Sequence, residues 1–521
     1  MLLGSSMPND NPYLQEVYAN LPRLLALFDR DPFSPTLGMG DRLYWSWKLK
    51  DFGNGTFQGA VHGLARLLSA QALPEWLPET SVLARIDSII MGTKRLTRRD
   101  GSLEEAFPYE SSFCVTALVA YDLLSCTALL ESRLSAKQRQ CWLEVVAPMI
   151  RFLLHADETH ALISNHLATA VAALLRWHIL TGEPTDKRAH ELLDRIVKHA
   201  SPEGWFKEYE GADPGYQTLA LYYLTDVSAL KPDWELAPLL AKACKFLSYF
   251  VHPDGSFGGP YGSRDTRFFC PGGIEALAHT VPEAAALALA MRASIVEKRT
   301  VPLSAIDESN LVPFFNAYCK AAIEARVAPI PAPSLPCMSP GPWRQVFPEA
   351  GLLVQRGQHE YTVVSWHKGG VVCHFTKEGA AKIDCAPVFR DSTGNLYSAQ
   401  HSTIENEFEL SEDAIVIKAQ LRPLRHELPT PIRFLALRLL NVTVMRSRFA
   451  SEIVKQLLVR FLITGRGKKA GNVIRTVRFA PSCVEDRIEG HAEEWQRQAT
   501  ESYAAIHMAS RGYWQRGDDC R

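Results

Sequence analysis

Two short stretches of this sequence carry an amide, an imidazole and a phenol that could act together. Asn165 and His166 stand where one apolar helical pattern begins, and Tyr216 lies in the first turn of another, directly after an Asp-Pro-Gly turn. An amide and an imidazole could bind a sugar carboxylate, and the imidazole could also relay a proton. A phenol could protonate a leaving oxygen or, beside a cation, act as a phenolate base. Each residue alone also fits a structural role, since Asn is a common helix N-cap.

Cationic, aromatic and polar side chains nearby could hold the rest of such a substrate. Arg264 and Arg267 share a loop that follows a glycine-rich turn, and guanidinium groups bind carboxylates through two parallel hydrogen bonds. A surface loop stabilised by Arg264 and Asp265 would explain the same residues. Trp47 could line a sugar-stacking wall or belong to the helical core, and Glu110 could simply favour a helix N-terminus. The candidates for substrate contact are Arg264, Arg267, Glu110, Trp47, Asn54, Gln58 and Glu208.

The elements that must position these residues are helical in the first part of the chain. From about residue 12 to about residue 326, apolar residues recur at the three- and four-residue spacing of amphipathic helices. We expect helices along Leu14–Phe28, Phe113–Leu130, Cys141–Leu154, Leu167–Leu180, Tyr216–Leu230, Leu236–Val251, Ile274–Ile295 and Leu311–Ala325.

A short repeat punctuates this helical region at multiples of roughly 50 residues, the length of two helices with their loops. Each copy reads acidic residue, glycine, any residue, then an apolar or aromatic residue, and we expect a turn in which the glycine adopts a positive φ. Helical hairpins stacked at that period predict an incomplete α/α toroid whose turns gather at one end. The copies begin at Asp100-Gly101, Glu203-Gly204 and Asp254-Gly255.

A proline-rich run between Val327 and Trp343 cannot form the interior of a helix and marks the best domain boundary. After it the pattern changes to β-branched and aromatic runs of strand length, which predict an antiparallel β-sandwich. The fold class is therefore α+β and multidomain, with a toroid over 1–326, a linker over 327–344 and a sandwich over 345–521. The expected strands include Tyr361–Trp366, Gly370–Phe375, Ala414–Ala419, Leu435–Met445, Leu457–Ile463 and Val473–Phe479.

This order of elements resembles the heparinase II/III-like polysaccharide lyases, including their alginate-lyase relatives, from about residue 40 to about residue 480. The Asn-His pair, the tyrosine and the linker are followed by Ser365-Trp366-His367-Lys368-Gly369-Gly370 and later by His401-Ser402-Thr403-Ile404. The resemblance implies that Asn165 and His166 neutralise a uronate carboxylate and that Tyr216 is the general acid. It also implies that His367 lies opposite them, and Tyr397 is a second phenol that could share the acid–base work.

Some members of that family hold a metal through histidines and an aspartate of the β-domain. Asp384 and His401 fall on two of those positions, whereas Gly369 stands where the third would be, so His374 is the substitute ligand. We expect no required cofactor. A structural zinc or calcium ion in the β-domain is the metal that these residues suggest.

The reaction favoured by these residues is β-elimination, in which the C5 proton of a uronic acid leaves and the 4-oxygen is expelled. Hydrogen-bond donors would stabilise the enediolate that develops. The expected partner is an acidic polysaccharide or oligosaccharide. A uronyl C5-epimerase, a glycoside hydrolase using two of Glu208, Glu210 and Asp213, and a non-catalytic glycan-binding protein of a polysaccharide biosynthesis locus remain as alternatives.

Composition narrows the classes of partner and compartment. A net charge of −1 with 22% charged residues gives no basic excess, so we expect no nucleic-acid partner. No apolar run is long enough to span a bilayer. The first residues lack a secretory signal pattern and the 11 cysteines are scattered, so we expect a cytoplasmic protein with reduced thiols, with the periplasm as the alternative. The sequence does not determine an oligomeric state.

Overall fold

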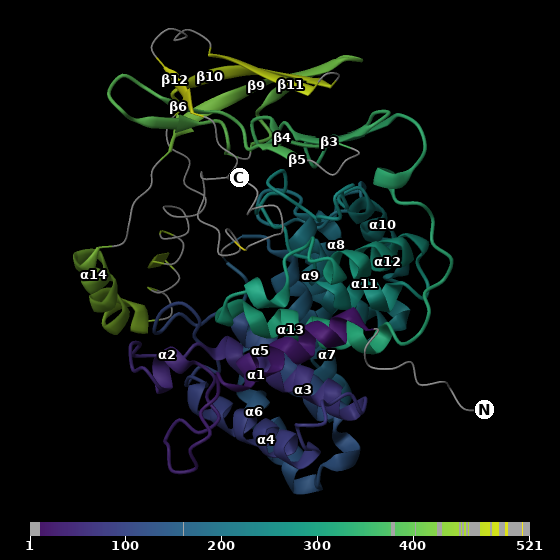
Figure 1. The fold of residues 1–521 in the computed structure, drawn as a ribbon. Helices are drawn as coiled ribbons and strands as arrows, with labels where there is room; N and C mark the ends of the chain where they lie inside the picture. Colours follow the sequence, from purple (N-terminus) through teal and green to yellow (C-terminus); the bar gives the residue numbers. More distant parts are fainter. Residues whose placement is uncertain are drawn as a thin grey trace.

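The computed structural model places a helical domain beside a region of antiparallel sheets (Figure 1). The residues that it describes are 11–159, 161–376, 381–401, 403–424, 430–447, 450, 453–454, 457, 469–479, 482–488, 495–498 and 513. None of the helices in this part of the chain has the length and apolar character needed to cross a membrane.

Six helices form the inner layer of the helical domain, each packing on the next, with the last returning to the first. They are apolar almost all round, as α5 illustrates, because other helices surround them on every side. The resulting architecture is an α/α toroid. The inner helices are α3 (Ala60–Ser69), α5 (Phe113–Leu129), α7 (Ser164–Thr181), α9 (Pro214–Leu230), α11 (Pro271–Leu277) and α13 (Glu308–Glu324).

A second set of helices packs outside this ring and buries a single face. In α8, for example, the buried residues are Ala189, Leu192, Leu193 and Ile196, the spacing of one helical stripe. The sequence pattern located most of these helices, although it did not single out α4 or α8. The outer helices are α1 (Pro12–Leu25), α4 (Glu79–Leu96), α6 (Ala136–His155), α8 (Asp186–His199), α10 (Ala237–Ser248) and α12 (Pro282–Val296); a short α2 (Arg42–Trp45) follows α1.

The expected repeat of glycine turns is confirmed. Gly101, Gly204 and Gly255 have φ values of 89°, 100° and 83°. Each turn closes with the same pair of backbone hydrogen bonds. In the second turn, for example, the Gly204 amide donates to the Ser201 carbonyl oxygen, and the Ser201 amide donates to the Trp205 carbonyl oxygen. A side chain would not fit at Gly204, because its Cβ would lie 2.4 Å from the carbonyl oxygen of Lys242 in α10. The repeat therefore docks each turn on a neighbouring helix.

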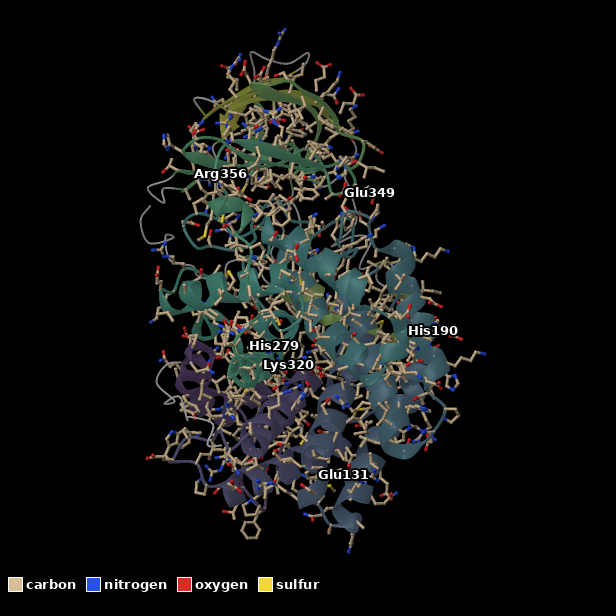
Figure 2. The ribbon with its side chains drawn as sticks, turned by 90° about the vertical axis from the view of Figure 1, so that its right-hand side faces the viewer. Glu131, His190, His279, Lys320, Glu349 and Arg356 are labelled. Carbon is tan, nitrogen blue, oxygen red and sulfur yellow. The ribbon has the colours of Figure 1, made fainter. Side chains whose placement is uncertain are left out.

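Charged residues occupy the interior of the ring towards the C-terminal ends of its helices. Asp226 of α9 accepts a hydrogen bond from Lys320 of α13 at 2.5 Å and lies 3.6 Å from Arg66 and 3.8 Å from Arg176; Figure 2 shows Lys320 inside the helical domain. Burial alone would raise the pKa of Asp226, but these three cations hold that pKa well below its usual range. Cations at helix C-termini are favoured by the helix dipole, so the cluster suits its position.

The β-sheet region contains two antiparallel sheets. The first has the order β1 (Trp343–Phe347), β2 (Leu352–Arg356), β3 (Glu360–Ser365), β4 (Val371–Thr376) and β5 (Ala381–Asp384). The second has the order β11 (Ser482–Ile488), β10 (Gly471–Phe479), β9 (Ala414–Pro423), β7 (Leu396–Ser398), β6 (Val388–Arg390) and β12 (Gln496–Gln498), with β8 (Glu407–Leu410) on β9.

Successive side chains along the strands of the first sheet point alternately into two different hydrophobic cores. Val363 and Cys373 join the core shared with the helical domain, whereas their neighbours Val364 and Val372 join the core between the two sheets. The predicted β-sandwich is thereby confirmed, and its inner sheet packs directly on the toroid. The Phe375 ring stacks on His252 with centroids 4.2 Å apart, and Figure 2 shows Glu349 near this junction, where it accepts a hydrogen bond from Ser201 at 2.5 Å.

Two sequence expectations were wrong. Leu435–Met445 was expected as a strand, yet helix α14 (Pro431–Val442) covers most of it, since Thr430 caps its N-terminus and Leu, Ala and Arg favour helix. The single helix expected along Ile274–Ile295 is two helices, because Pro282 begins α12. Most of Leu457–Ile463 lies outside the described residues.

Candidate active site

The site residues gather where α7 and α9 begin, at the end of the toroid that meets the inner sheet. The segment before α9 is tied to the start of α7 by an isolated bridge between Ile163 and Glu208. Ser164 completes the link, because its hydroxyl donates to the carbonyl oxygen of Lys207 at 2.7 Å. Side chains at 165, 166 and 208 are thereby held close together, although 43 residues separate the two segments.

Asn165 and Glu208 form the buried part of this site. The Asn165 amide nitrogen donates to both Glu208 carboxylate oxygens, at 3.0 and 2.9 Å. Burial raises the pKa of Glu208 to about 8, and the hydrogen bond from Asn165 offsets only part of that rise. Glu208 is thus largely protonated at neutral pH, which leaves a neutral carboxyl group able to donate a hydrogen bond.

His166 pairs with a glutamate that precedes α7. Its Nδ1 lies 2.7 Å from Oε2 of Glu158, whose side chain is almost fully buried, while the imidazole keeps 20% of its surface exposed. A carboxylate on one ring nitrogen fixes the orientation of the ring and leaves the other nitrogen for a further partner. This arrangement is suited to proton transfer.

Tyr216 lies in the first turn of α9, one residue after Gly215. Asp213 caps that helix, accepting from the Tyr216 amide at 3.1 Å, and its other oxygen accepts from the Arg264 amide at 2.8 Å. The half-buried Tyr216 ring packs edge-on against Phe268, with centroids 5.4 Å apart. Asp213 therefore orients both the start of α9 and the loop that carries Arg264.

Arg264 places a buried positive charge beside these groups. Its guanidinium carbon lies 4.1 Å from the centre of the Tyr209 ring, and only 7% of the residue is exposed. Its Nε atom has no hydrogen-bond partner in the described part of the chain. Tyr209, held at a φ of 57°, also lies within electrostatic reach of Glu208 and Tyr216. A buried guanidinium with an unused donor is suited to binding an anion.

Lys368 is the side chain that the β-sheet region contributes to this site. It follows β3, is buried, and donates from Nζ to the carbonyl oxygen of Gly262 at 2.6 Å. Burial lowers the pKa of Lys368 to about 8, against the opposing effect of Asp265 and Asp213. Lys368 rather than its neighbour His367 is therefore the side chain that contacts the loop bearing Arg264.

The contacts of the two other residues expected to take part in catalysis involve different partners. The His367 ring packs beside Trp366 and against Gly351, where an added Cβ would lie 2.0 Å from the ring. The Tyr397 ring stacks on Trp495 in the outer sheet, and its hydroxyl donates to Asp391 at 3.2 Å. None of these contacts reaches Tyr216, because the inner sheet separates Tyr397 from the toroid.

Several of the residues expected to contact substrate make hydrogen bonds within the fold. The buried Gln58 amide donates to the carbonyl oxygens of Gly38 and Ile89, and the Asn54 side chain caps η2 (Gly55–Gly59). The carboxylate of Glu110 accepts from two backbone amides of its own loop. Trp47 is 63% exposed and lies outside the buried cluster. Arg267 lies near the buried cluster, with its Nε atom 4.0 Å from Oδ1 of Asp265.

The geometry does not support the expected metal site. Both oxygens of Asp384 are engaged by guanidinium groups, with Arg475 at 2.7 Å and Arg497 at 3.0 Å. Nδ1 of His374 lies 2.9 Å from the Thr362 hydroxyl. Neither these residues nor His401 belong to any group of three His, Cys, Asp or Glu side chains that could hold a metal within the described residues.

Sequence reasoning missed Glu158, Tyr209 and Lys368 as members of the site. Glu158 stands eight residues before its histidine partner, a separation with no motif attached to it. Lys368 lay inside the quoted strand motif, next to the histidine that drew attention. Tyr513, from the end of the chain, was also missed; it donates to Asp307 at 2.8 Å and lies within electrostatic reach of Tyr216.

Comparison with known proteins supports the fold. No protein-family model and no curated protein matches the chain. The chondroitin AC lyase of Streptomyces coelicolor A3, solved in complex with chondroitin sulphate, is similar over 81% of this chain and 68% of its own, with 13% identity and a TM-score of 0.52. Its likeness extends over the helical domain and the sheets, and at that identity it shows the fold alone.

Two further solved structures are less similar to the chain. A Paenibacillus xanthan lyase is similar over 82% of this chain and 46% of its own, with 12% identity and a TM-score of 0.48. The cellobiose 2-epimerase of Bacillus thermoamylovorans B4167 is similar over 62% of this chain and 100% of its own, with 11% identity and a TM-score of 0.45. Polysaccharide lyases and sugar epimerases thus both occur among the structural neighbours, and membership of the heparinase II/III-like family is not confirmed.

Proposed function

We propose that this protein is a polysaccharide lyase that cleaves a uronic-acid-containing polysaccharide or oligosaccharide by β-elimination. The observation that carries the proposal is the buried Arg264 guanidinium, whose Nε has no partner among the described residues, set beside a largely neutral Glu208. An anionic sugar would supply the missing acceptor. The imidazole of His166 and the phenol of Tyr216, at the starts of neighbouring helices, would supply the proton transfers.

Carboxylate binding would fall to Arg264, with Glu208 as a neutral donor. An ionised Glu208 would repel a uronate, so its raised pKa favours the substrate at neutral pH. Asn165 would hold Glu208 in place through its two hydrogen bonds. Donors aimed at the substrate carboxylate strengthen as the enediolate develops, and each is typically worth about 3 kcal/mol of barrier.

The acid–base roles follow from the partners of each side chain. With Nδ1 donating to Glu158, His166 would present Nε2 as the base that removes the C5 proton. The C5–H electrons form the C4–C5 double bond as the C4–O bond breaks. Tyr216 would donate its proton to the leaving oxygen and recover one from solvent. Lys368 would add a positive charge from the β-sheet region.

A glycoside hydrolase is the second candidate, favoured by one observation. A glutamic acid with a pKa of about 8 matches the general acid of such enzymes. Of the other carboxylates, Asp213 is fully engaged as a helix cap and Glu158 holds His166, which leaves the half-buried Glu210 as the second carboxylate. A uronyl C5-epimerase would use the same base and differ only in returning the proton to C5. A cytoplasmic role on polymer precursors or imported oligomers, and kinship with heparinase II/III-like lyases, belong to the same proposal.

An absorbance assay against a panel of uronate polymers tests the proposal. A lyase product carries a 4,5-unsaturated uronate that absorbs in the near-ultraviolet, and we expect that signal from the native protein and its loss in Tyr216→Phe. Tyr249→Phe removes a half-buried phenol elsewhere and should keep full activity. New reducing ends without absorbance would establish hydrolysis, and solvent deuterium at C5 without cleavage would establish epimerisation. Full activity in Tyr216→Phe would overturn the assignment of the general acid.

A further inference from the structure

The charged residues inside the helical ring form a cluster with more cations than carboxylates. Its cations are Arg66 of α3, Arg176 of α7 and Lys320 of α13, which lie 3.6, 3.8 and 2.5 Å from the carboxylate of Asp226 on α9. We call these four residues the axial cluster. Lys320 also donates to the Thr225 hydroxyl at 2.9 Å, so its ammonium group is well satisfied. The two guanidinium groups lie farther from Asp226 than a hydrogen bond allows.

The neighbouring pair of His62 and Asp122 adds little negative charge to this cluster. Nδ1 of His62 lies 2.8 Å from Asp122, and Nε of Arg66 donates to Nε2 of His62 at 3.0 Å. That donation makes Nε2 an acceptor, so the imidazole is neutral. Burial raises the pKa of Asp122 well above its usual range and lowers the pKa of His62, which favours the neutral form of both. Arg66 therefore spends one nitrogen on an uncharged partner.

Two buried donors beside the cluster are unused. The Nε atom of Arg176 and the hydroxyl of Tyr222 have no hydrogen-bond partner among the residues that the structure describes. Tyr222 is 1% exposed, lies within electrostatic reach of Arg66, and has its ring centre 5.4 Å from Nζ of Lys320. The adjacent phenol of Tyr121 is different, because it donates to Asp226. A buried donor without an acceptor is destabilising, so these two groups call for a ligand that accepts hydrogen bonds.

The axial cluster is open to small solutes and separate from the candidate active site. The side chains of Arg66 and Arg176 keep 13% and 19% of their surface exposed. Asp226 follows Tyr216 by ten residues of α9, which places it about 15 Å farther along the helix; in Figure 2 Lys320 lies deep in the helical domain, away from the sheets. Helix dipoles favour cations at this end but accept no hydrogen bonds, so they leave the two donors unused.

We propose that the axial cluster binds a free oxyanion of the phosphate or sulfate class between Arg66, Arg176 and the Tyr222 hydroxyl. Guanidinium groups hold such ions through paired hydrogen bonds. The three groups come from α3, α7 and α9, so their donors approach from different directions, which suits a tetrahedral ion better than a planar carboxylate. A water molecule would satisfy the donors but leave the excess positive charge uncompensated. The bound ion would link three of the inner helices.

Titration calorimetry of the full-length protein with sodium phosphate, against sodium chloride of equal ionic strength, tests this site. We expect saturable phosphate binding and a Tm that rises with phosphate but not with chloride. Tyr222→Phe should raise the Kd by about tenfold or more, because one hydrogen bond to a charged group is lost. Its Tm in chloride should not fall, since that hydroxyl has no partner among the described residues. Arg176→Gln should weaken binding at least as much.

Two control variants separate this site from other effects. Tyr361→Phe removes a phenol that donates to the carbonyl oxygen of Tyr249 at 2.6 Å, so it should lower the Tm equally in both salts and keep the native Kd. Arg264→Lys alters the candidate active site and should also keep the native Kd. Equal Tm values in phosphate and chloride would overturn the proposal. Native affinity in both Tyr222→Phe and Arg176→Gln, with or without a loss in Arg264→Lys, would overturn it as well.

Discussion

The amide of Asn165 spans both carboxylate oxygens of Glu208, at 3.0 and 2.9 Å, in a position that solvent scarcely reaches. The contact joins the first turn of α7 to the segment that leads into α9. Because burial raises the pKa of Glu208 to about 8, the amide holds a carboxyl group that can change its charge near neutral pH. Stability and substrate binding should therefore both depend on this pair.

The first prediction concerns the pH dependence of stability. A glutamate ordinarily titrates with a pKa near 4.5, whereas burial raises the pKa of Glu208 to about 8, so the folded state holds a proton that the unfolded chain releases between those values. The free energy of unfolding should fall as pH rises through that window, by up to a few kcal/mol from this residue. Glu208→Gln should show a smaller fall between pH 5 and pH 8 in urea denaturation. Identical pH slopes for the two proteins would refute the assigned pKa.

The second prediction separates the two groups that titrate near pH 8. Lys368 is cationic below about pH 8 and neutral above it, so the KM for an anionic polymer should rise as pH increases through 8. Glu208 acts in the same direction, because it becomes negative over the same range. Lys368→Met and Glu208→Gln should each remove part of the rise, and the double variant should remove most of it. A KM that stays flat across pH 8 in the native protein would contradict both roles.

The third prediction concerns the pair formed by His166 and Glu158. Glu158→Gln keeps a hydrogen-bonding group but loses the charge that would stabilise an imidazolium. We expect kcat to fall by roughly 10²-fold with little change in KM, in the range of general acid–base contributions. His166→Ala should fall further, whereas His190→Ala, on the exposed face of α8, should not differ from the native protein. A normal kcat in Glu158→Gln would restrict that residue to a structural role.

The fourth prediction concerns the geometry of Arg264. Arg264→Lys keeps the positive charge but removes the planar fork and its stacking on Tyr209. We expect kcat/KM to fall by about tenfold or more, since a hydrogen bond to a charged group is worth about 1.5–3 kcal/mol. The matched control is Arg195→Lys, at a half-buried arginine paired with Asp157, and it should not change kcat/KM. Equal values for both variants would mean that Arg264 does not reach the substrate.

The fifth prediction concerns the repeated turns. Gly204 and Gly182 both have positive φ, so alanine costs each about 1–2 kcal/mol of backbone strain. Only at Gly204 would the new Cβ also meet a backbone carbonyl, that of Lys242 at 2.4 Å; at Gly182 nothing lies within 4 Å. Gly204→Ala should therefore lose about 1–3 kcal/mol more in chemical denaturation than Gly182→Ala. Comparable losses would show that the turn yields without strain.

Local sequence determined most of the helices and strands. Apolar spacing predicted most helices of the toroid, and the repeated glycines predicted three turns whose hydrogen bonds are the same. Runs of β-branched and aromatic residues predicted β3, β4, β9 and β10. This signal failed at Leu435–Met445, because an apolar run of that length suits both strand and helix, and exposure on α14 left no core to decide between them.

The tertiary structure alone decided which side chains meet. The sequence placed Asn165, His166 and Tyr216 at helix starts, but their partners come from other segments. Glu158 pairs with the His166 imidazole, and Glu208 accepts from the Asn165 amide. Arg264 packs on Tyr209, which lies within electrostatic reach of Tyr216. His367 was expected at the site; the structure shows its neighbour Lys368 in contact with the loop that carries Arg264, whereas the His367 ring packs beside Trp366. Burial and charge pairing depend on distances across the fold, which the order of residues does not encode locally.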